Sequence, residues 1–196
     1  MKTFVERFCE RYKQTEEALR SLLPHMTEVA VPRGGLLVEM GSRNPYFYLL
    51  KSGLLRGYLT RDGNESTVWF ICPGEAAFSS WGYVAGAPAQ ISIEALADSV
   101  VYRISRSDFE RLFSSSLHFA NMGRRFFERE ILSYDQWNVL YNVSTAKERY
   151  LTLMKNEPDL LQHVPLKHLA SYLNITPQSL SRIRANLSKS RTLTHR

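Results

Sequence analysis

The chain has 196 residues, 44% of them hydrophobic, and carries a formal net charge of +6 at pH 7. This length suits one large domain or two modest ones, and the apolar content excludes an intrinsically disordered chain. No apolar run approaches the roughly 18 residues of a membrane span, and the N-terminus lacks the basic-then-apolar order of a signal peptide, so we expect a cytoplasmic protein that does not bind a membrane.

The spacing of the cysteines and the absence of common catalytic motifs argue against further classes of function. Cys9 and Cys72 stand alone, without a C-x-x-C pair or a Cys/His cluster, which argues against a structural zinc or an iron–sulfur centre. The sequence holds no G-x-S-x-G, Walker or H-E-x-x-H motif. We therefore predict no metal and no cofactor, and we do not expect an enzyme.

The N-terminal segment, as far as about Leu23, carries apolar residues at helical spacing, namely Phe4, Phe8, Tyr12, Leu19 and Leu22. Thr15 is followed by two glutamates, which predicts a helix start, and Pro24 predicts a stop.

From Glu28 to about Ser105, short β-rich stretches alternate with turn residues. The stretches are 29–31, 36–40, 46–50, 54–60, 67–71, 91–95 and 100–104. Asp62-Gly63 lies between two of them and predicts a tight hairpin. Strands at such regular spacing predict an antiparallel β-roll or barrel of the jelly-roll type.

From Ser107 onward the pattern is helical. A short helix is expected from Ser107 or Asp108 to Phe113, and a longer one from about Leu117 to Tyr141. The apolar residues of the longer helix cover more than one face, so the helix must be buried on two sides. One side can pack on the roll, and a second subunit can cover the other in a coiled-coil-like seam. The alternative is a central helix in the core of a monomer; we favour the homodimer.

The excess positive charge lies at the C-terminal end. Residues 144–196 contain nine Lys/Arg and three Asp/Glu, whereas residues 1–143 contain sixteen of each. A basic C-terminal unit beside a neutral body suggests a polyanionic partner.

Residues 164–187 predict two short helices joined by a tight turn. An apolar stripe of Leu166, Leu169, Ala170 and Leu173 ends at Asn174-Ile175, and Thr176-Pro177 opens the next helix. Asn suits a left-handed turn position, and Thr followed by Pro suits a helix N-terminus. Leu180, Ile183 and Leu187 then form one buried face. This arrangement is a helix-turn-helix.

The face opposite these leucines is expected to read DNA. Gln can contact adenine, Arg can contact guanine, and Ser is adaptable, so we expect base contacts from Gln178, Ser181 and Arg182. Lysine and histidine at the periphery suit phosphate contacts. The complete predicted DNA-binding set is Thr176, Gln178, Ser179, Ser181, Arg182, Lys189, Lys167 and His168.

Taken together, these features resemble the Crp/Fnr family, that of the cyclic-AMP receptor protein. Tyr48 to Gly53 resembles the end of one of its roll strands, Pro73-Gly74-Glu75 resembles the opening of its phosphate-binding cassette, and residues 171–184 (SYLNITPQSLSRIR) resemble its helix-turn-helix. The long helix is similar to its dimerisation helix. The family's base readers would correspond to Pro177, Gln178 and Arg182, of which Pro177 cannot hydrogen-bond through its side chain.

The resemblance implies an α+β fold with an N-terminal antiparallel β-roll of the cyclic-nucleotide-binding type, a long dimerisation helix and a C-terminal helix-turn-helix. The expected boundaries are 1–113 for the N-terminal helix and roll, 114–143 for the long helix and 144–196 for the DNA-binding domain. The implied partners are a palindromic operator in double-stranded DNA, a second copy of the chain and RNA polymerase.

The cassette departs from the pattern of the family's cyclic-nucleotide binders, which carry Arg followed by Ser or Thr. This sequence has Ala89-Gln90 at that place. A phosphate would meet Glu75 without a cation, and an unpaired buried charge costs about several kcal/mol or more. We expect Gly74, Glu75, Phe78, Ala89 and Gln90 to line a pocket for an unidentified effector that is not cyclic AMP. Arg33, Arg43 or Arg56 could still supply a cation from another strand.

The sequence therefore favours a dimeric, sequence-specific DNA-binding transcription regulator that is not controlled by cyclic AMP. The alternative, from another class, is a ligand-binding or protein-interaction sensor module whose helix-turn-helix is only structural.

Overall fold

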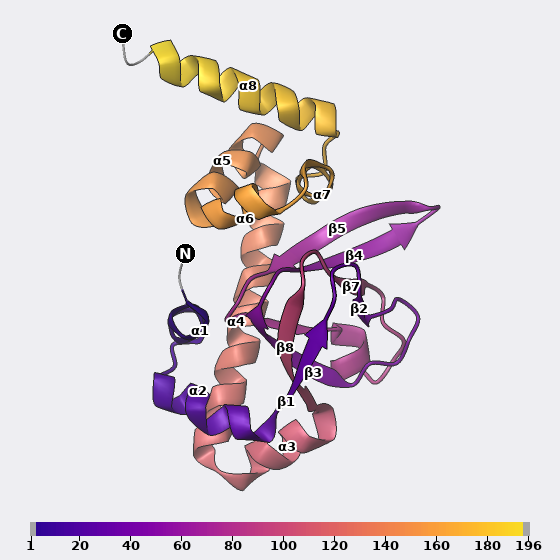
Figure 1. Ribbon diagram of the computed structural model, residues 1–196, viewed down its shortest axis with the longest axis vertical. Coiled ribbons are helices and arrows are strands. Elements are labelled where there is room, and N and C mark those ends of the chain that lie inside the picture. Colours follow the sequence, from indigo (N-terminus) through magenta and orange to yellow (C-terminus); the bar gives the residue numbers. More distant parts are fainter. Residues whose placement is uncertain (1–2, 194–196) are drawn as a thin grey trace.

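The computed structural model describes residues 3–193, with side chains as far as residue 188 (Figure 1). It begins with helices α1 (Phe4–Tyr12) and α2 (Glu16–Leu22) and a 3₁₀ turn, η1 (Leu23–His25). The Thr15 hydroxyl accepts the Ala18 N–H and caps α2, so the predicted helix start is confirmed. The two helices separate at Lys13, whose φ is 52°.

Two four-stranded antiparallel sheets form the roll, with strand orders β1-β8-β3-β6 and β2-β7-β4-β5. The strands are β1 (Thr27–Val31), β2 (Leu36–Val38), β3 (Tyr46–Ser52), β4 (Leu55–Arg61), β5 (Asn64–Ile71), β6 (Ala76–Phe78), β7 (Ser92–Ala95) and β8 (Ser99–Ser105). The predicted roll is confirmed. Strand β6 and the π-helical turn η2 (Ser80–Val84) were not predicted.

Two turns of the roll depend on their residue types. Asp62 and Gly63, with φ values of 52° and 77°, join β4 to β5, as expected of an Asp-Gly hairpin whose central residues both need a positive φ. Gly53, between β3 and β4, has a φ of 97°, and a Cβ there would lie 2.1 Å from the Ser99 Oγ. No other residue type fits at Gly53 without a shift of the chain.

Apolar side chains fill the interior of the roll. The buried members of this cluster are Val31, Val38, Tyr48, Leu50, Leu55, Ile71, Ala77, Ala89, Ile93, Ala95 and Val101. A second cluster lies outside the roll, where α1, α2 and the later helices pack on β3 and β6, and it contains Phe8, Tyr12, Phe47 and Phe126. Helices that precede the roll in the sequence and helices that follow it thus cover the same face of the roll.

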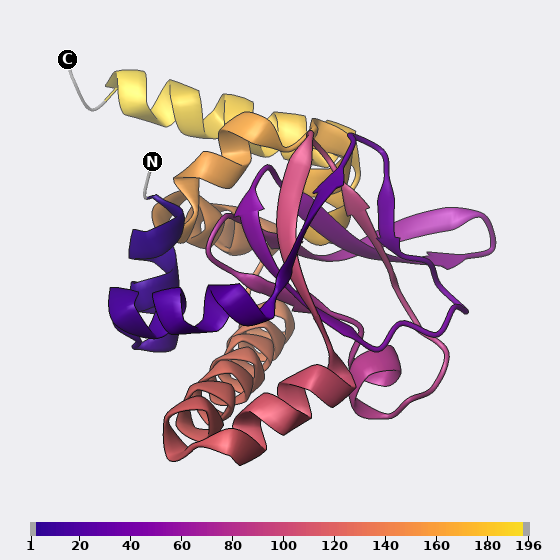
Figure 2. The ribbon, with the colours of Figure 1, turned by 60° about the horizontal axis from the view of Figure 1, so that its bottom comes forward.

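After the roll come α3 (Arg106–Ser115), α4 (Leu117–Val143), α5 (Ala146–Asn156), α6 (Pro158–His163), α7 (Leu166–Tyr172) and α8 (Pro177–Leu193). At 27 residues, α4 is about 40 Å long and passes along the roll from α3 to the C-terminal helices (Figures 1 and 2). The predicted long helix and the predicted helix pair α7–α8 are confirmed, whereas α5 and α6 were not predicted. No described helix is long and apolar enough to cross a membrane.

The C-terminal helices share a core with the roll. Leu54, Phe70 and Cys72 of the roll belong to the same buried cluster as Leu169, Ala170, Leu173 and Leu180. This shared core positions α7, the first helix of the helix-turn-helix, against strand β5.

Candidate nucleic-acid interface

The turn between α7 and α8 has the predicted geometry. Asn174 has a φ of 52°, in the left-handed region that Asn tolerates well. The Thr176 hydroxyl accepts the Ser179 N–H at 3.2 Å, and Pro177 is the first residue of α8. The Asn174 side chain donates to the Tyr141 hydroxyl, which connects the turn to the end of α4.

Helix α7 is the buried member of the pair. Ala170 is fully buried, and its small side chain allows α8 to cross closely. The structure disagrees with the phosphate contact expected of His168, because only 7% of this residue is exposed. Burial lowers the pKa of His168, and the nearby Arg56 acts in the same direction. Lys167, by contrast, is exposed, and its phosphate contact stays a prediction.

Contacts with the roll and with α4 hold α7 in place. The Thr67 N–H of β5 donates to the Ser171 Oγ at 2.8 Å. The Tyr172 ring stacks on Trp137 of α4, with ring centroids 4.3 Å apart and 14° between the planes, and it meets Phe70 of β5 edge-on. Residues of strand β5 and of helix α4 therefore fix the position of α7.

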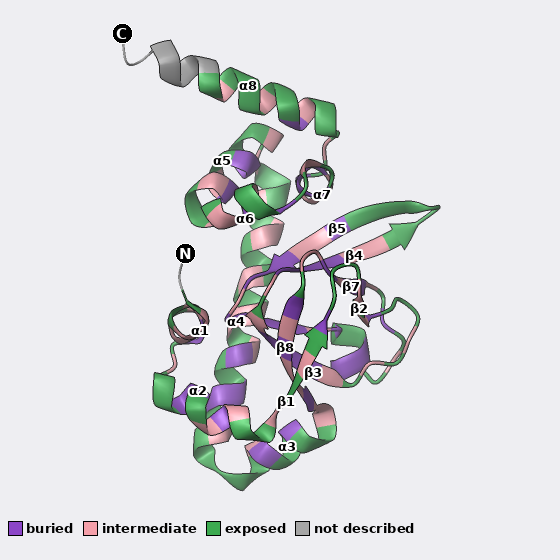
Figure 3. Cartoon of the chain, in the orientation of Figure 1, coloured by how far each residue is buried: buried purple, intermediate pink, exposed green. Residues whose placement is uncertain are grey.

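Helix α8 has one buried and one exposed face (Figure 3). Leu180 is fully buried, and Ile183 and Leu187 pack beside it on the C-terminal core. Gln178, Ser181 and Arg182 are exposed, and Arg182 donates to the Ser179 Oγ at 3.2 Å. The side chain of Lys189 lies outside the described residues.

A second exposed surface runs along α4. Met122 and Phe126 are buried against the roll, which accounts for one apolar side of the helix. Farther along, Ile131, Tyr134 and Val139 are 65%, 67% and 63% exposed, respectively. The apolar side chains of this stretch therefore face solvent in the single chain.

The structure does not bring the five predicted pocket residues together. Ala89 is buried inside the roll, whereas Gln90 is exposed and its amide donates to the Pro88 carbonyl. Phe78 packs against Phe47 in the cluster outside the roll. Gly74 and Glu75 face α1 instead, so the expected single pocket is not formed.

Glu75 has cations that the sequence analysis missed. It is buried, accepts the Cys72 N–H at 2.9 Å, and lies 3.0 Å from Arg11 and 3.8 Å from Arg7. Burial raises the pKa of Glu75, and Arg11 opposes that shift. A Cβ on Gly74 would lie 2.7 Å from the Phe4 carbonyl oxygen, so this turn touches α1. The four-residue spacing of Arg7 and Arg11 places both on one helix face, but many charged pairs in the sequence have such spacing, so it did not identify them as partners of Glu75.

The arginines considered as alternative cations have other partners. Arg56 is buried and donates to Thr67, Glu65 and Glu94. The Arg43 side chain donates to the Gly86 carbonyl. Arg33 is exposed.

Comparison with known proteins agrees with this architecture. Residues 28–116 match the family profile described as the cyclic nucleotide-binding domain. A stretch of 97 residues, half of this chain, is 25% identical to the cAMP-dependent protein kinase regulatory subunit of Blastocladiella emersonii. The matched stretch spans about a quarter of that protein's length (24%).

Solved structures extend the likeness beyond the roll. FixK2 from Bradyrhizobium japonicum is 21% identical with a TM-score of 0.71, covering 84% of this chain and 85% of that one. A CooA mutant from Carboxydothermus hydrogenoformans is 16% identical with a TM-score of 0.70, covering 87% and 79%. The c-di-GMP-responsive regulator CLP from Xanthomonas campestris is 16% identical with a TM-score of 0.67, covering 89% and 92%.

The protein therefore shares its fold with these solved structures: a cyclic-nucleotide-binding-type β-roll, a long helix and a C-terminal helix-turn-helix.

Proposed function

We propose that the protein is a dimeric, sequence-specific DNA-binding transcription regulator of the Crp/Fnr type that does not respond to cyclic AMP. The observation that carries the proposal is the exposed face of α8, where Gln178, Ser181 and Arg182 follow a capped helix N-terminus. Such a helix can enter the major groove and contact base edges with its first turns. The basic excess of residues 144–196 favours the approach to a phosphate backbone.

The proposed dimer rests on the apolar surface of α4. Ile131, Tyr134 and Val139 are each more than half exposed, and burying such side chains between two copies of the helix is favourable. A two-fold dimer would present two copies of α8 to DNA, which suits a palindromic operator. The proposal includes three domains, residues 1–113, 114–143 and 144–196. It also includes RNA polymerase as a partner.

Independence from cyclic AMP is supported by the surroundings of the altered cassette. Ala89 contributes a methyl group to the apolar interior of the roll, and the Gln90 amide donates to a neighbouring carbonyl. Arg56 already has three acceptors. A cyclic phosphate at this place would lose its hydration without gaining an ion pair, which is strongly unfavourable.

The test is a selection of the full chain on a randomised duplex library without added nucleotide, followed by sedimentation of the complex. We expect a two-fold symmetric site with half-sites about 34 Å apart, bound by two chains. Sequence-blind binding that disappears at moderate salt would contradict the proposal and favour a sensor module with a structural helix-turn-helix. Calorimetry with cyclic AMP is expected to give no heat of binding, and saturable micromolar binding would overturn that part.

A further inference from the structure

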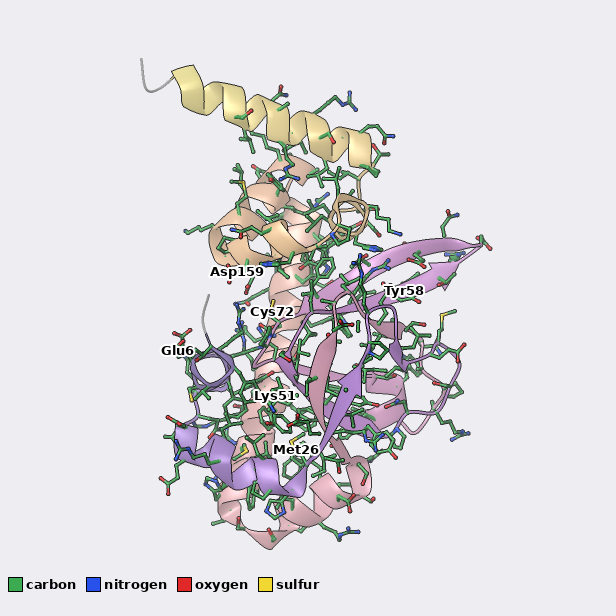
Figure 4. All side chains as sticks on the ribbon, viewed as in Figure 1. Glu6, Met26, Lys51, Tyr58, Cys72 and Asp159 are labelled. Atoms are coloured by element: carbon green, nitrogen blue, oxygen red, sulfur yellow. The ribbon has the colours of Figure 1, made fainter. Side chains whose placement is uncertain are left out.

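A cleft of about 930 Å³ lies between α1, α4 and the start of α6, on the outside of the roll. Figure 4 shows its surroundings: Asp159 of α6 lies close to Cys72 of the roll, and α1, which carries Glu6, lies alongside. Its volume falls in the upper part of the roughly 300–1,000 Å³ found for small-molecule sites. The cleft is separate from the roll interior and from the exposed face of α8.

Cations from two helices line this cleft. Helix α1 and the residue after it supply Arg7, Arg11 and Lys13, and α4 supplies Arg124, Arg125 and Arg129. Arg7 and Arg11 share the buried Glu75, and Arg124 pairs with Glu128 on its own helix. Within the part of the chain that the structure describes, no ion pair includes Arg129.

Unmatched hydrogen-bond donors gather in the same place. Four buried side-chain polar atoms of the described residues have no hydrogen-bond partner, and three of them are the Nε atoms of Arg7, Arg11 and Arg129. Buried polar atoms of a folded protein are nearly always hydrogen-bonded, so such a cluster needs an explanation. A guanidinium group presents several N–H donors in a plane, and carboxylates and phosphates match that geometry with two oxygens at once.

Carboxylates from four parts of the chain also line the cleft: Glu10 of α1, Glu75 of the roll, Glu128 of α4, and Glu157 and Asp159 at the start of α6. Arg7 lies 3.1 Å from the Glu157 carboxylate and 3.7 Å from that of Asp159, at the start of α6. These ion pairs join α1 to the helices that carry the helix-turn-helix. An anion that takes their place on Arg7 would therefore act at the contact between the N-terminal helix and the DNA-binding part.

We propose that this cleft binds a compact small molecule with two or more phosphate or carboxylate groups, held by Arg7, Arg11 and Arg129. The binding itself does not depend on the DNA-binding role. Its effect on DNA affinity, through the exchange of the Arg7 ion pairs with α6, rests on the proposed function.

The test is calorimetry of the full chain with two probes, pyrophosphate and citrate, at constant ionic strength. We expect saturable binding of at least one probe at one site per chain, and the preferred probe assigns phosphate or carboxylate chemistry to the site. Arg129→Gln is expected to weaken that binding at least tenfold. Arg124→Gln, on the exposed part of the same wall, is a second variant that should weaken it by a smaller factor.

Two control variants test whether the loss of one positive charge anywhere on the protein weakens binding of the probe. Arg20→Gln on α2 removes the same charge away from the cleft, and Arg182→Gln removes it from α8; both are expected to bind the probe like the unchanged protein. Absence of saturable heat with both probes, or equal affinity of Arg129→Gln and Arg20→Gln, would overturn the proposal. Loss of binding in Arg182→Gln would place the anion on α8 and overturn it as well. DNA binding by the unliganded protein tests the proposed function separately.

Discussion

Helices α7 and α8 are neighbours in the sequence and contribute to the same buried cluster, yet they are buried to different extents. Helix α7 has His168, Leu169 and Ala170 buried between the roll and the other C-terminal helices. Helix α8 buries Leu180 and leaves Gln178 and Arg182 in solvent. The two helices of the helix-turn-helix therefore differ: α7 anchors the pair in the core, and α8 exposes polar side chains to solvent.

This difference has a physical cause in the contacts of α7. Thr67 of β5 donates to Ser171, and Tyr172 lies between Trp137 of α4 and Phe70 of β5. The roll and the long helix therefore determine the direction in which α8 points. A change on α7 should act mainly on stability, whereas a change on the outer face of α8 should act mainly on binding.

The largest effect is expected from Leu169→Ala on α7. Leu169 is 1% exposed, and a buried leucine truncated to alanine loses apolar contacts and leaves a cavity, which costs about 2–5 kcal/mol in the free energy of unfolding. Urea denaturation measures this loss. The matched control is Leu151→Ala on α5, where the leucine is 40% exposed and the change should stay within about 0.5 kcal/mol. Equal effects of the two substitutions would contradict the buried position of α7.

An intermediate effect, on binding rather than on stability, is expected from Arg182→Ala. Loss of one base contact should cost about 1–3 kcal/mol at a single position of the operator and relax specificity there. Fluorescence anisotropy on the selected duplex and on its single-base variants measures it. Arg184→Ala is the control, because Arg184 is also exposed but lies about 160° around the helix. If Arg184→Ala changed the base preference as much as Arg182→Ala did, the assignment of the reading face would be wrong.

The smallest effect is expected from the pH dependence of His168. Burial lowers its pKa below the ordinary value of 6.5, so the unfolded chain takes up a proton at a pH where the folded chain does not. The stability that His168 contributes is therefore present above pH 6.5 and is lost as the pH falls through the lower pKa of the folded state. Urea unfolding at pH 7.5 and 5.5 should show a smaller loss in His168→Gln than in the unchanged protein. His163→Gln, at an exposed histidine, should lose as much stability between the two pH values as the unchanged protein. A smaller loss in His163→Gln than in His168→Gln would contradict the prediction.

Local patterns predicted the elements whose residues make their contacts close by in sequence. The hairpin at Asp62-Gly63, the left-handed Asn174 and the Thr176 cap all depend on φ angles or hydrogen bonds within a few residues, and each is confirmed. Helix α5 was missed although its capping box was readable, since Thr145 and Glu148 hydrogen-bond to each other's backbone N–H groups.

Features that depend on distant contacts could not be predicted from the sequence. His168 was expected at the surface as a phosphate contact on the helix before α8, but packing of α7 on β5 covers it. Glu75 was assigned to a pocket within the roll, whereas its partners Arg7 and Arg11 lie more than sixty residues earlier. A search of the whole sequence for paired charges would not have separated these arginines from the others, because only the docking of α1 selects them.

The stacked pair of Trp137 and Tyr172 gives the protein an optical reporter of its own. Trp137 is one of three tryptophans, and its ring lies 4.3 Å from that of Tyr172, while the other two belong to the roll. Indole emission depends on the polarity and the contacts around the ring. A movement of α7 away from α4 therefore changes the wavelength and the intensity of the Trp137 fluorescence. The contact between α4 and the helix-turn-helix can thus be followed in solution without an attached dye.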